Sequence, residues 1–109
     1  MSVRPVIPRL QAQRDIDDAV EYCVGQGTTQ AALGFIDALE QALGHIGRYP
    51  ASGSPRYAHE LDLPGLRCWP LTAYPYMLFY VEQSNHVDLW RVLHGQRDIP
   101  ASMRDPDEG

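Results

Sequence analysis

The sequence predicts an α+β fold in which a helical hairpin packs on one face of a mostly antiparallel sheet. Apolar residues recur with helical spacing in the first half of the chain and with strand spacing after residue 65. At 109 residues the chain is long enough for one domain, which we expect over residues 1–109. The expected order of elements is β-α-α-β-β-β, and a further short strand at residues 60–63 is left open. The acidic end, from about residue 101 to 109, is expected to be a flexible tail.

The chain is expected to begin with a strand and a helix. Residues 3–7 are apolar but are interrupted by Pro5, which has no N–H for a β-ladder and is typical of an edge strand. Residues 10–25 then carry one apolar stripe at helical spacing, and Gly25 and Gly27 are expected to end this helix. The stripe consists of Ile16, Ala19, Val20, Cys23 and Val24.

A second helix is expected after a short connection. Thr28 or Thr29 can cap its first turn, and Tyr49-Pro50 stops it. Because only a few residues join the two helices, we expect them to form an antiparallel hairpin. The apolar positions of the second helix are Ala32, Phe35, Ile36, Leu39, Leu43 and Ile46.

The second half of the chain is expected to form the sheet. Residues 51–59 are rich in Gly, Ser and Pro and predict a loop. Strands are then expected at 66–72, 76–82 and 86–94, with a turn at Gln83-Ser84-Asn85. The middle one is almost continuously apolar, which favours a central position in the sheet.

Charge and apolar content exclude several classes of protein. The net charge is −5, and all nine basic residues are Arg. Because phosphate contacts need positive charge, an acidic chain is a poor general binder of nucleic acid, although a local arginine cluster is still compatible with it. No stretch approaches the roughly 20 apolar residues of a membrane span, and the first ten residues lack a signal-peptide core. We therefore expect a cytoplasmic protein without direct membrane contact.

The usual catalytic and metal-binding motifs are absent from the sequence. It contains no GxSxG, P-loop, HExxH or GxGxxG string, and its four histidines form no ligand pair on one helix face. Cys23 and Cys68 do not have the spacing of metal ligands and are interpreted as two buried thiols. We expect neither a metal nor a cofactor.

Three blocks of the second half resemble a known family. The run RVLHGQRDIP at residues 91–100 resembles the RVLHGxRD ending of ParE-type toxins of the RelE/ParE superfamily. Gly65-Leu66-Arg67 and the run YMLFY at residues 76–80 resemble that family's GLR strand and its central strand. The spacing between the blocks fits, as do the first strand and the helical hairpin, so the resemblance covers roughly residues 3–100.

This resemblance implies the toxin of a type II toxin–antitoxin system, of the kind linked to plasmid stabilisation. ParE-type toxins inhibit DNA gyrase by binding it, and a ParD-type antitoxin holds them inactive by wrapping its C-terminal segment around them. The RelE branch shares the fold but is an enzyme that cleaves messenger RNA on the ribosome. A homologue that keeps antitoxin binding but has lost toxicity is the third alternative.

The C-terminal strands supply the candidate site residues. Cleavage of RNA by its 2′-hydroxyl requires a base, an acid and a cation for the phosphate charge. A ribonuclease of this fold would draw them from Arg67, Arg91, His94 and Arg97. The candidates for contact with a target protein are Arg67, Trp69, Arg91, His94 and Arg97.

Strand geometry weighs against a joint role of Arg91 and His94. They are three residues apart, so strict alternation places them on opposite faces of the sheet. The same alternation places Arg91 on the face of the strand that carries Val87, Leu89 and Leu93.

Structural roles are open for the same arginines. Arg91 can lay its stem on apolar surface and pair with a carboxylate such as Asp88, Glu82 or Asp98. Arg97 and Asp98 can tie the chain end to the sheet.

An antitoxin is the expected partner under all three alternatives. We expect it to lay an apolar segment across the helical hairpin, to add a strand to an open sheet edge as a further option, and to carry Arg or Lys that compensate the acidic toxin. The candidate contact residues are Val20, Val24, Phe35, Leu39, Leu43 and Trp90.

Overall fold

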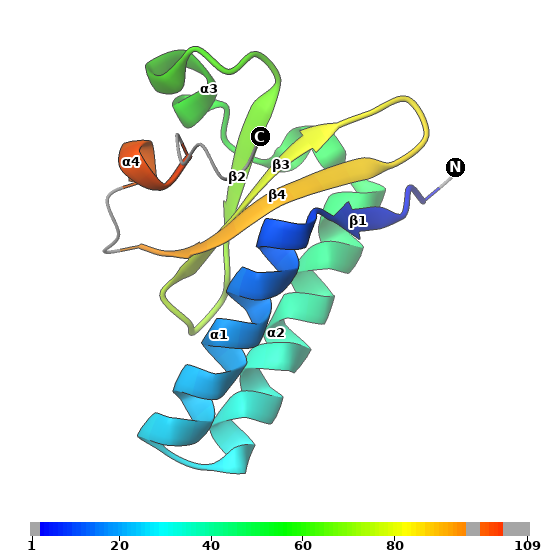
Figure 1. The fold of residues 1–109 in the computed structure, drawn as a ribbon. Helices are drawn as coiled ribbons and strands as arrows, with labels where there is room; N and C mark the ends of the chain where they lie inside the picture. Colours follow the sequence, from blue (N-terminus) through cyan, green and yellow to red (C-terminus); the bar gives the residue numbers. More distant parts are fainter. Residues whose placement is uncertain (1–2, 96–98, 104–109) are drawn as a thin grey trace.

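A strand and two long helices form the first half of the chain (Figure 1). The computed structural model describes residues 3–95 and 99–103. Thr28 caps the second helix, where its hydroxyl oxygen accepts a hydrogen bond from the Ala31 N–H at 3.2 Å. The predicted helical hairpin is confirmed. The elements are β1 (Val6–Pro8), α1 (Leu10–Gln26) and α2 (Thr29–Arg48).

Two short helices precede the sheet strands. A 3₁₀ helix, η1, spans Pro50–Ser52, and α3 spans Arg56–Leu61. The loop predicted for 51–59 and the strand left open at 60–63 are therefore wrong in this segment. The helix forms because it packs Tyr57, Ala58 and Leu61 against the sheet.

The sheet strands lie where the sequence places them. Strand β3 has the predicted bounds, and β2 and β4 lie within the predicted segments. The helix α4 takes up residues 101–103 of the expected tail, and residues 104–109 lie outside the described residues. The elements are β2 (Leu66–Pro70), β3 (Tyr76–Glu82), β4 (Val87–His94) and α4 (Ile99–Met103).

The four strands are arranged in the order β1-β4-β3-β2. Strand β1 pairs in parallel with β4, whereas β4 with β3 and β3 with β2 are antiparallel, so the sheet is mostly antiparallel as predicted. Strand β1 is short, and its pairing runs only from Val6 opposite Val87 to Pro8 opposite Leu89. The rest of β4 therefore extends beyond the end of its neighbour.

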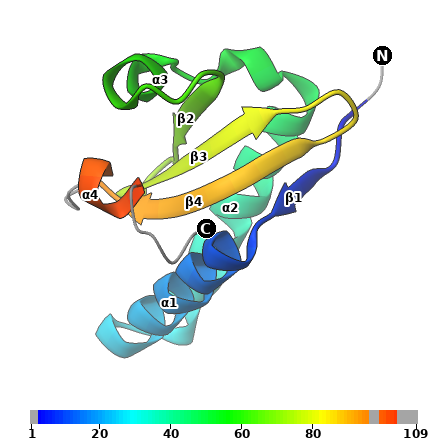
Figure 2. The same cartoon turned by 45° about the horizontal axis from the view of Figure 1, so that its top comes forward.

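Both faces of the sheet are covered (Figures 1 and 2). The hairpin of α1 and α2 covers one face, and its core includes Phe35, Leu78 and Tyr80, all fully buried. The other face holds Phe79 and Leu66 under α3 and α4. Burial of each such side chain stabilises the fold by about 1.5–3 kcal/mol. The predicted packing of the hairpin is confirmed, and the short helices add a second layer.

Candidate functional site

A β-bulge changes the direction of side chains in the middle of β4. Phe79 of β3 pairs with Arg91 and the next residue, Tyr80, pairs with Leu89, so Trp90 is an extra residue in β4. Leu89 consequently lies in the core under the hairpin, whereas Leu93 lies in the core on the other face. Strict alternation is therefore wrong in placing Leu89 and Leu93 on the same face of the sheet.

Asp15 of α1 forms hydrogen bonds with the part of β4 that has no β1 residue opposite it. Its carboxylate accepts hydrogen bonds from Arg91 Nε at 2.7 Å, from Arg91 Nη2 at 3.0 Å and from the Val92 backbone N–H at 3.0 Å. Asp15 and Arg91 are only 8% and 5% exposed. A paired, fully hydrogen-bonded geometry is what makes a buried charge tolerable.

The partner of Arg91 differs from those the sequence suggests. Arg91 does pair with a carboxylate, but the carboxylate belongs to Asp15, 76 residues earlier in the chain. Asp88 instead binds Arg9, and Glu82 binds Arg4. Because its guanidinium is buried against Asp15, Arg91 does not stand at the surface as a clamp for phosphate.

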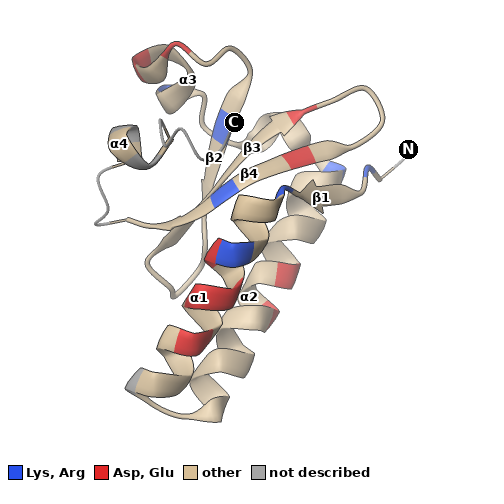
Figure 3. Cartoon of the chain, viewed as in Figure 1, with Lys and Arg blue, Asp and Glu red and all other residues tan. Residues whose placement is uncertain are grey.

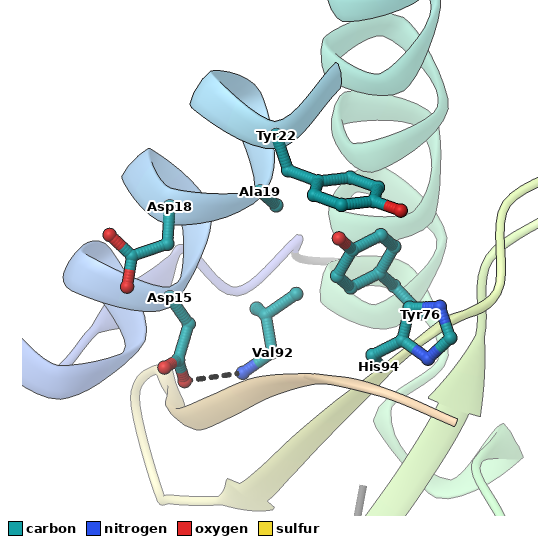
Figure 4. A pocket seen from close by; sticks show the side chains of 7 residues that line it. All are labelled: Asp15, Asp18, Ala19, Tyr22, Tyr76, Val92 and His94. Atoms are coloured by element: carbon teal, nitrogen blue, oxygen red, sulfur yellow. Dashed lines mark hydrogen bonds between the residues drawn. The ribbon is translucent and has the colours of Figure 1, made fainter. Parts of the chain in front are cut away.

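A cleft of about 330 Å³ lies between α1 and the end of β4 (Figure 4). We call it the α1–β4 cleft. In Figure 4 the rings of Tyr22 and Tyr76 stand at one end of it and the carboxylates of Asp15 and Asp18 at the other. The Tyr76 ring meets the His94 ring edge-on, with centroids 5.2 Å apart. Its lining residues are Asp15, Asp18, Ala19, Tyr22, Tyr76, Val92 and His94.

A second, more apolar pocket of about 230 Å³ adjoins this cleft. We call it the tyrosine pocket; it shares Tyr22, Tyr76 and His94 with the cleft. Phe35 packs edge-on against the rings of Tyr74 and Tyr76, with centroids 5.9 and 5.3 Å apart, and so holds two of its walls from the core. Its lining residues are Tyr22, Cys23, Gly27, Ala31, Tyr74, Pro75, Tyr76 and His94.

The electrostatics of the cleft are acidic. Acidic residues line up along α1, as Figure 3 shows, and two of them, Asp15 and Asp18, are part of the cleft wall. The charge of Asp15 is balanced by Arg91, whereas Asp18 makes no ion pair within the described residues, so Asp18 gives this end of the cleft its negative charge. The cleft therefore favours a cationic ligand.

Two other target-contact candidates lie on β2. Arg67 is half-buried, and its Nη1 donates a hydrogen bond to the Gly53 carbonyl at 2.9 Å. Trp69 is half-buried and stacks on His45 of α2, with ring centroids 4.4 Å apart. The fifth candidate, Arg97, lies outside the described residues.

The candidates for antitoxin contact have unequal access to solvent. Phe35 and Leu39 are 0% and 5% exposed and build the core under the hairpin. Val24 is exposed, and Val20 and Leu43 are half-buried.

Trp90, the remaining candidate, is also half-buried. Its indole N–H donates to Asp88 at 3.1 Å, and the Arg9 guanidinium lies 4.3 Å from its ring centroid. Trp90 therefore stands in a small polar network beside the edge strand.

Burial suppresses ionisation of two groups near β2. Burial raises the pKa of the Cys68 thiol, an effect that Arg56 partly opposes. Burial likewise raises the pKa of Tyr80, whose hydroxyl donates to the Pro50 carbonyl and accepts from the Gly53 N–H. A protonated, buried thiol is a poor nucleophile, so Cys68 has a structural role.

No cluster of three His, Cys, Asp or Glu side chains suited to a metal ion occurs among residues 3–95 and 99–103. Within the same part of the chain, no helix has the length and apolar content that crossing a membrane requires.

Asp15 and Tyr22 are site residues that the sequence did not predict. Asp15 carries a recognisable signal, because the buried positions of α1 are Ala12, Asp15, Ala19 and Cys23, which recur at helical spacing. A carboxylate within an apolar stripe predicts a buried partner, although it does not identify Arg91. Tyr22 is exposed on the helix, and its role depends on β3 and β4.

Comparisons with known proteins give one family and one fold. The family model described as the ParE toxin of the type II toxin–antitoxin system parDE matches residues 6–99. No curated protein matches the chain significantly. A solved structure described as the chromosomal ParDE toxin–antitoxin system from P. aeruginosa is similar, with a TM-score of 0.71 and 15% identity over 84% of this chain and 96% of that chain.

Proposed function

The chain belongs to the family of ParE toxins of type II toxin–antitoxin systems, and from this premise we propose that it inhibits DNA gyrase by binding it and that a ParD-type antitoxin neutralises it. The observation that carries the proposal is the match of the family model to residues 6–99, nearly the whole of the described chain. Gyrase acts on DNA in the cytoplasm, so we also expect the toxin there.

The geometry supports a binding function over RNA cleavage. A ribonuclease site needs an exposed cation beside an acid or base. Arg91 is buried against Asp15, and His94 opens into a cleft beside the carboxylate of Asp18. This arrangement favours binding over cleavage of a scissile phosphate.

Contact with gyrase is proposed for the β2 surface. Arg67 and Trp69 are half-buried neighbours on this strand, and Arg and Trp are enriched among residues that dominate binding energy. Because we expect Arg67 to anchor this contact, Arg67→Ala is expected to weaken gyrase inhibition about tenfold or more.

The proposal is tested by assaying supercoiling of relaxed plasmid by purified gyrase, ATP and increasing toxin. We expect loss of supercoiled product at micromolar toxin, and recovery when the antitoxin is added first. Unchanged supercoiling by a folded toxin that still binds its antitoxin would instead indicate a homologue that has lost toxicity.

A further inference from the structure

The α1–β4 cleft and the tyrosine pocket adjoin each other and differ in chemistry, and we call the two together the depression. Tyr22, Tyr76 and His94 line both, so the acidic cleft and the apolar pocket meet at these three side chains. Tyr22 is 57% exposed, which leaves a large aromatic side chain at the surface between them. Aromatic side chains in this position are frequent anchors of protein interfaces.

The acidic end holds a carboxylate that the described structure leaves available. Asp15 is occupied by Arg91 and the Val92 N–H. Asp18, one turn further along α1, is exposed and makes no ion pair with any residue in 3–95 or 99–103. An incoming cation at Asp18 would also lie near the tyrosine rings, whose faces attract cations.

Strand addition is disfavoured at two places where a partner could extend the sheet. At β4 the Val92 N–H is already bound by the Asp15 carboxylate. At the outer edge of β2, Ser54 exchanges two backbone hydrogen bonds of 2.9 Å with Cys68. A partner at the cleft therefore has to bind through inserted side chains.

We propose that this depression receives a segment of the antitoxin that places an Arg side chain against Asp18 and the Tyr22 and Tyr76 rings, and an adjacent large apolar side chain in the tyrosine pocket. The inference rests on the proposed function, because it assigns the antitoxin as occupant. Arg fits better than Lys because its planar guanidinium can stack on a ring while it binds a carboxylate. The Asp18 carboxylate disfavours a phosphate backbone as the occupant.

The test uses the full-length toxin and the ParD-type antitoxin encoded beside its gene, with the dissociation constant measured by titration calorimetry. Asp18→Arg and Tyr22→Ala each alter an exposed residue of the cleft. Asp37→Arg is the matched control, because it makes the same charge change at an exposed position of α2 outside the cleft. We expect Kd to rise at least about tenfold for the two cleft variants and less than about threefold for the control.

A charge exchange separates direct contact from a general effect of charge. Among antitoxin variants with single Arg→Glu changes, one is expected to recover at least about tenfold of the affinity lost by Asp18→Arg.

Three results would overturn the inference. If the unaltered toxin does not bind the antitoxin, the proposed function fails and the inference fails with it. If the unaltered toxin binds but Asp18→Arg behaves like Asp37→Arg, only the inference fails. If Asp18→Arg keeps antitoxin affinity but loses gyrase inhibition, the cleft belongs to the target surface instead.

Discussion

The pair of Asp15 and Arg91 joins the first helix to the last strand of the sheet. One carboxylate holds both the guanidinium of Arg91 and the Val92 N–H, so it satisfies a side chain and a backbone donor together. Because both charges are buried, removal of either one leaves the other without compensation. The arginine of the C-terminal motif is therefore explained here by stability.

Replacement of Asp15 by Ala is expected to lower the free energy of unfolding by about 3–5 kcal/mol, because it leaves Arg91 buried and unpaired. Glu60→Gln is the control: it removes an exposed ion pair with Arg56 and is expected to cost less than about 1 kcal/mol. Urea denaturation followed by circular dichroism measures both. Equal, small losses for the two variants would contradict this account of the buried pair.

The buried thiol and phenol predict a loss of stability in alkali. The pKa of Cys68 is raised above its ordinary value of 9.0, and that of Tyr80 above 10.0. The folded chain therefore holds these protons more tightly than the unfolded chain does. Their contribution is fully present below about pH 9 and is lost as pH rises through the raised values.

We expect the free energy of unfolding to fall with rising pH above about 9, with a smaller slope for Cys68→Ala than for the unaltered protein. Urea titrations at about pH 8, 9 and 10 give the slopes, which are compared within each protein because the substitution also leaves a small cavity. Identical slopes would show that Cys68 ionises equally easily in the folded and unfolded chains.

At the scale of elements, the regular parts were predictable and their irregularities were not. The apolar run of β3 and the stripe of α2 determine those elements through local pattern alone. The bulge at Trp90 depends on register with β3, which no local pattern records. The helix α3 escaped prediction because Gly, Ser and Pro around it are typical of loops.

The contact between the start of the chain and α2 requires a glycine. The Arg4 N–H donates to the Gly47 carbonyl at 3.0 Å, and a Cβ at Gly47 would lie 2.6 Å from the Arg4 carbonyl oxygen. The Arg4 oxygen belongs to the backbone, so it cannot move away from an added Cβ without displacing the segment that leads into β1.

Gly47→Ala is therefore expected to destabilise the protein by about 1–3 kcal/mol. Gly44→Ala, one turn earlier in α2, has no atom within 4 Å of the added Cβ and is expected to stabilise by about 0.5–1 kcal/mol. Thermal melts of the two variants separate these effects. A rise in Tm for both would contradict the close approach at Gly47.

At the scale of the whole molecule, the candidate site combines segments that are far apart in the chain. The C-terminal motif indicated the family and drew attention to Arg91 and His94, but it contains neither the carboxylates nor the tyrosines that surround them. Asp15 and Tyr22 come from α1, and Tyr76 comes from β3. Only the fold brings these together, and of the predicted target-contact residues the cleft they line contains His94.

We propose that this ParE family member acts by binding gyrase and not by cutting RNA. The most direct measurement assays one preparation in parallel for gyrase supercoiling and for messenger RNA cleavage in a translating extract. We expect supercoiling to be inhibited at micromolar toxin while the messenger RNA stays intact. Codon-specific cleavage of the messenger RNA with undisturbed supercoiling would contradict it.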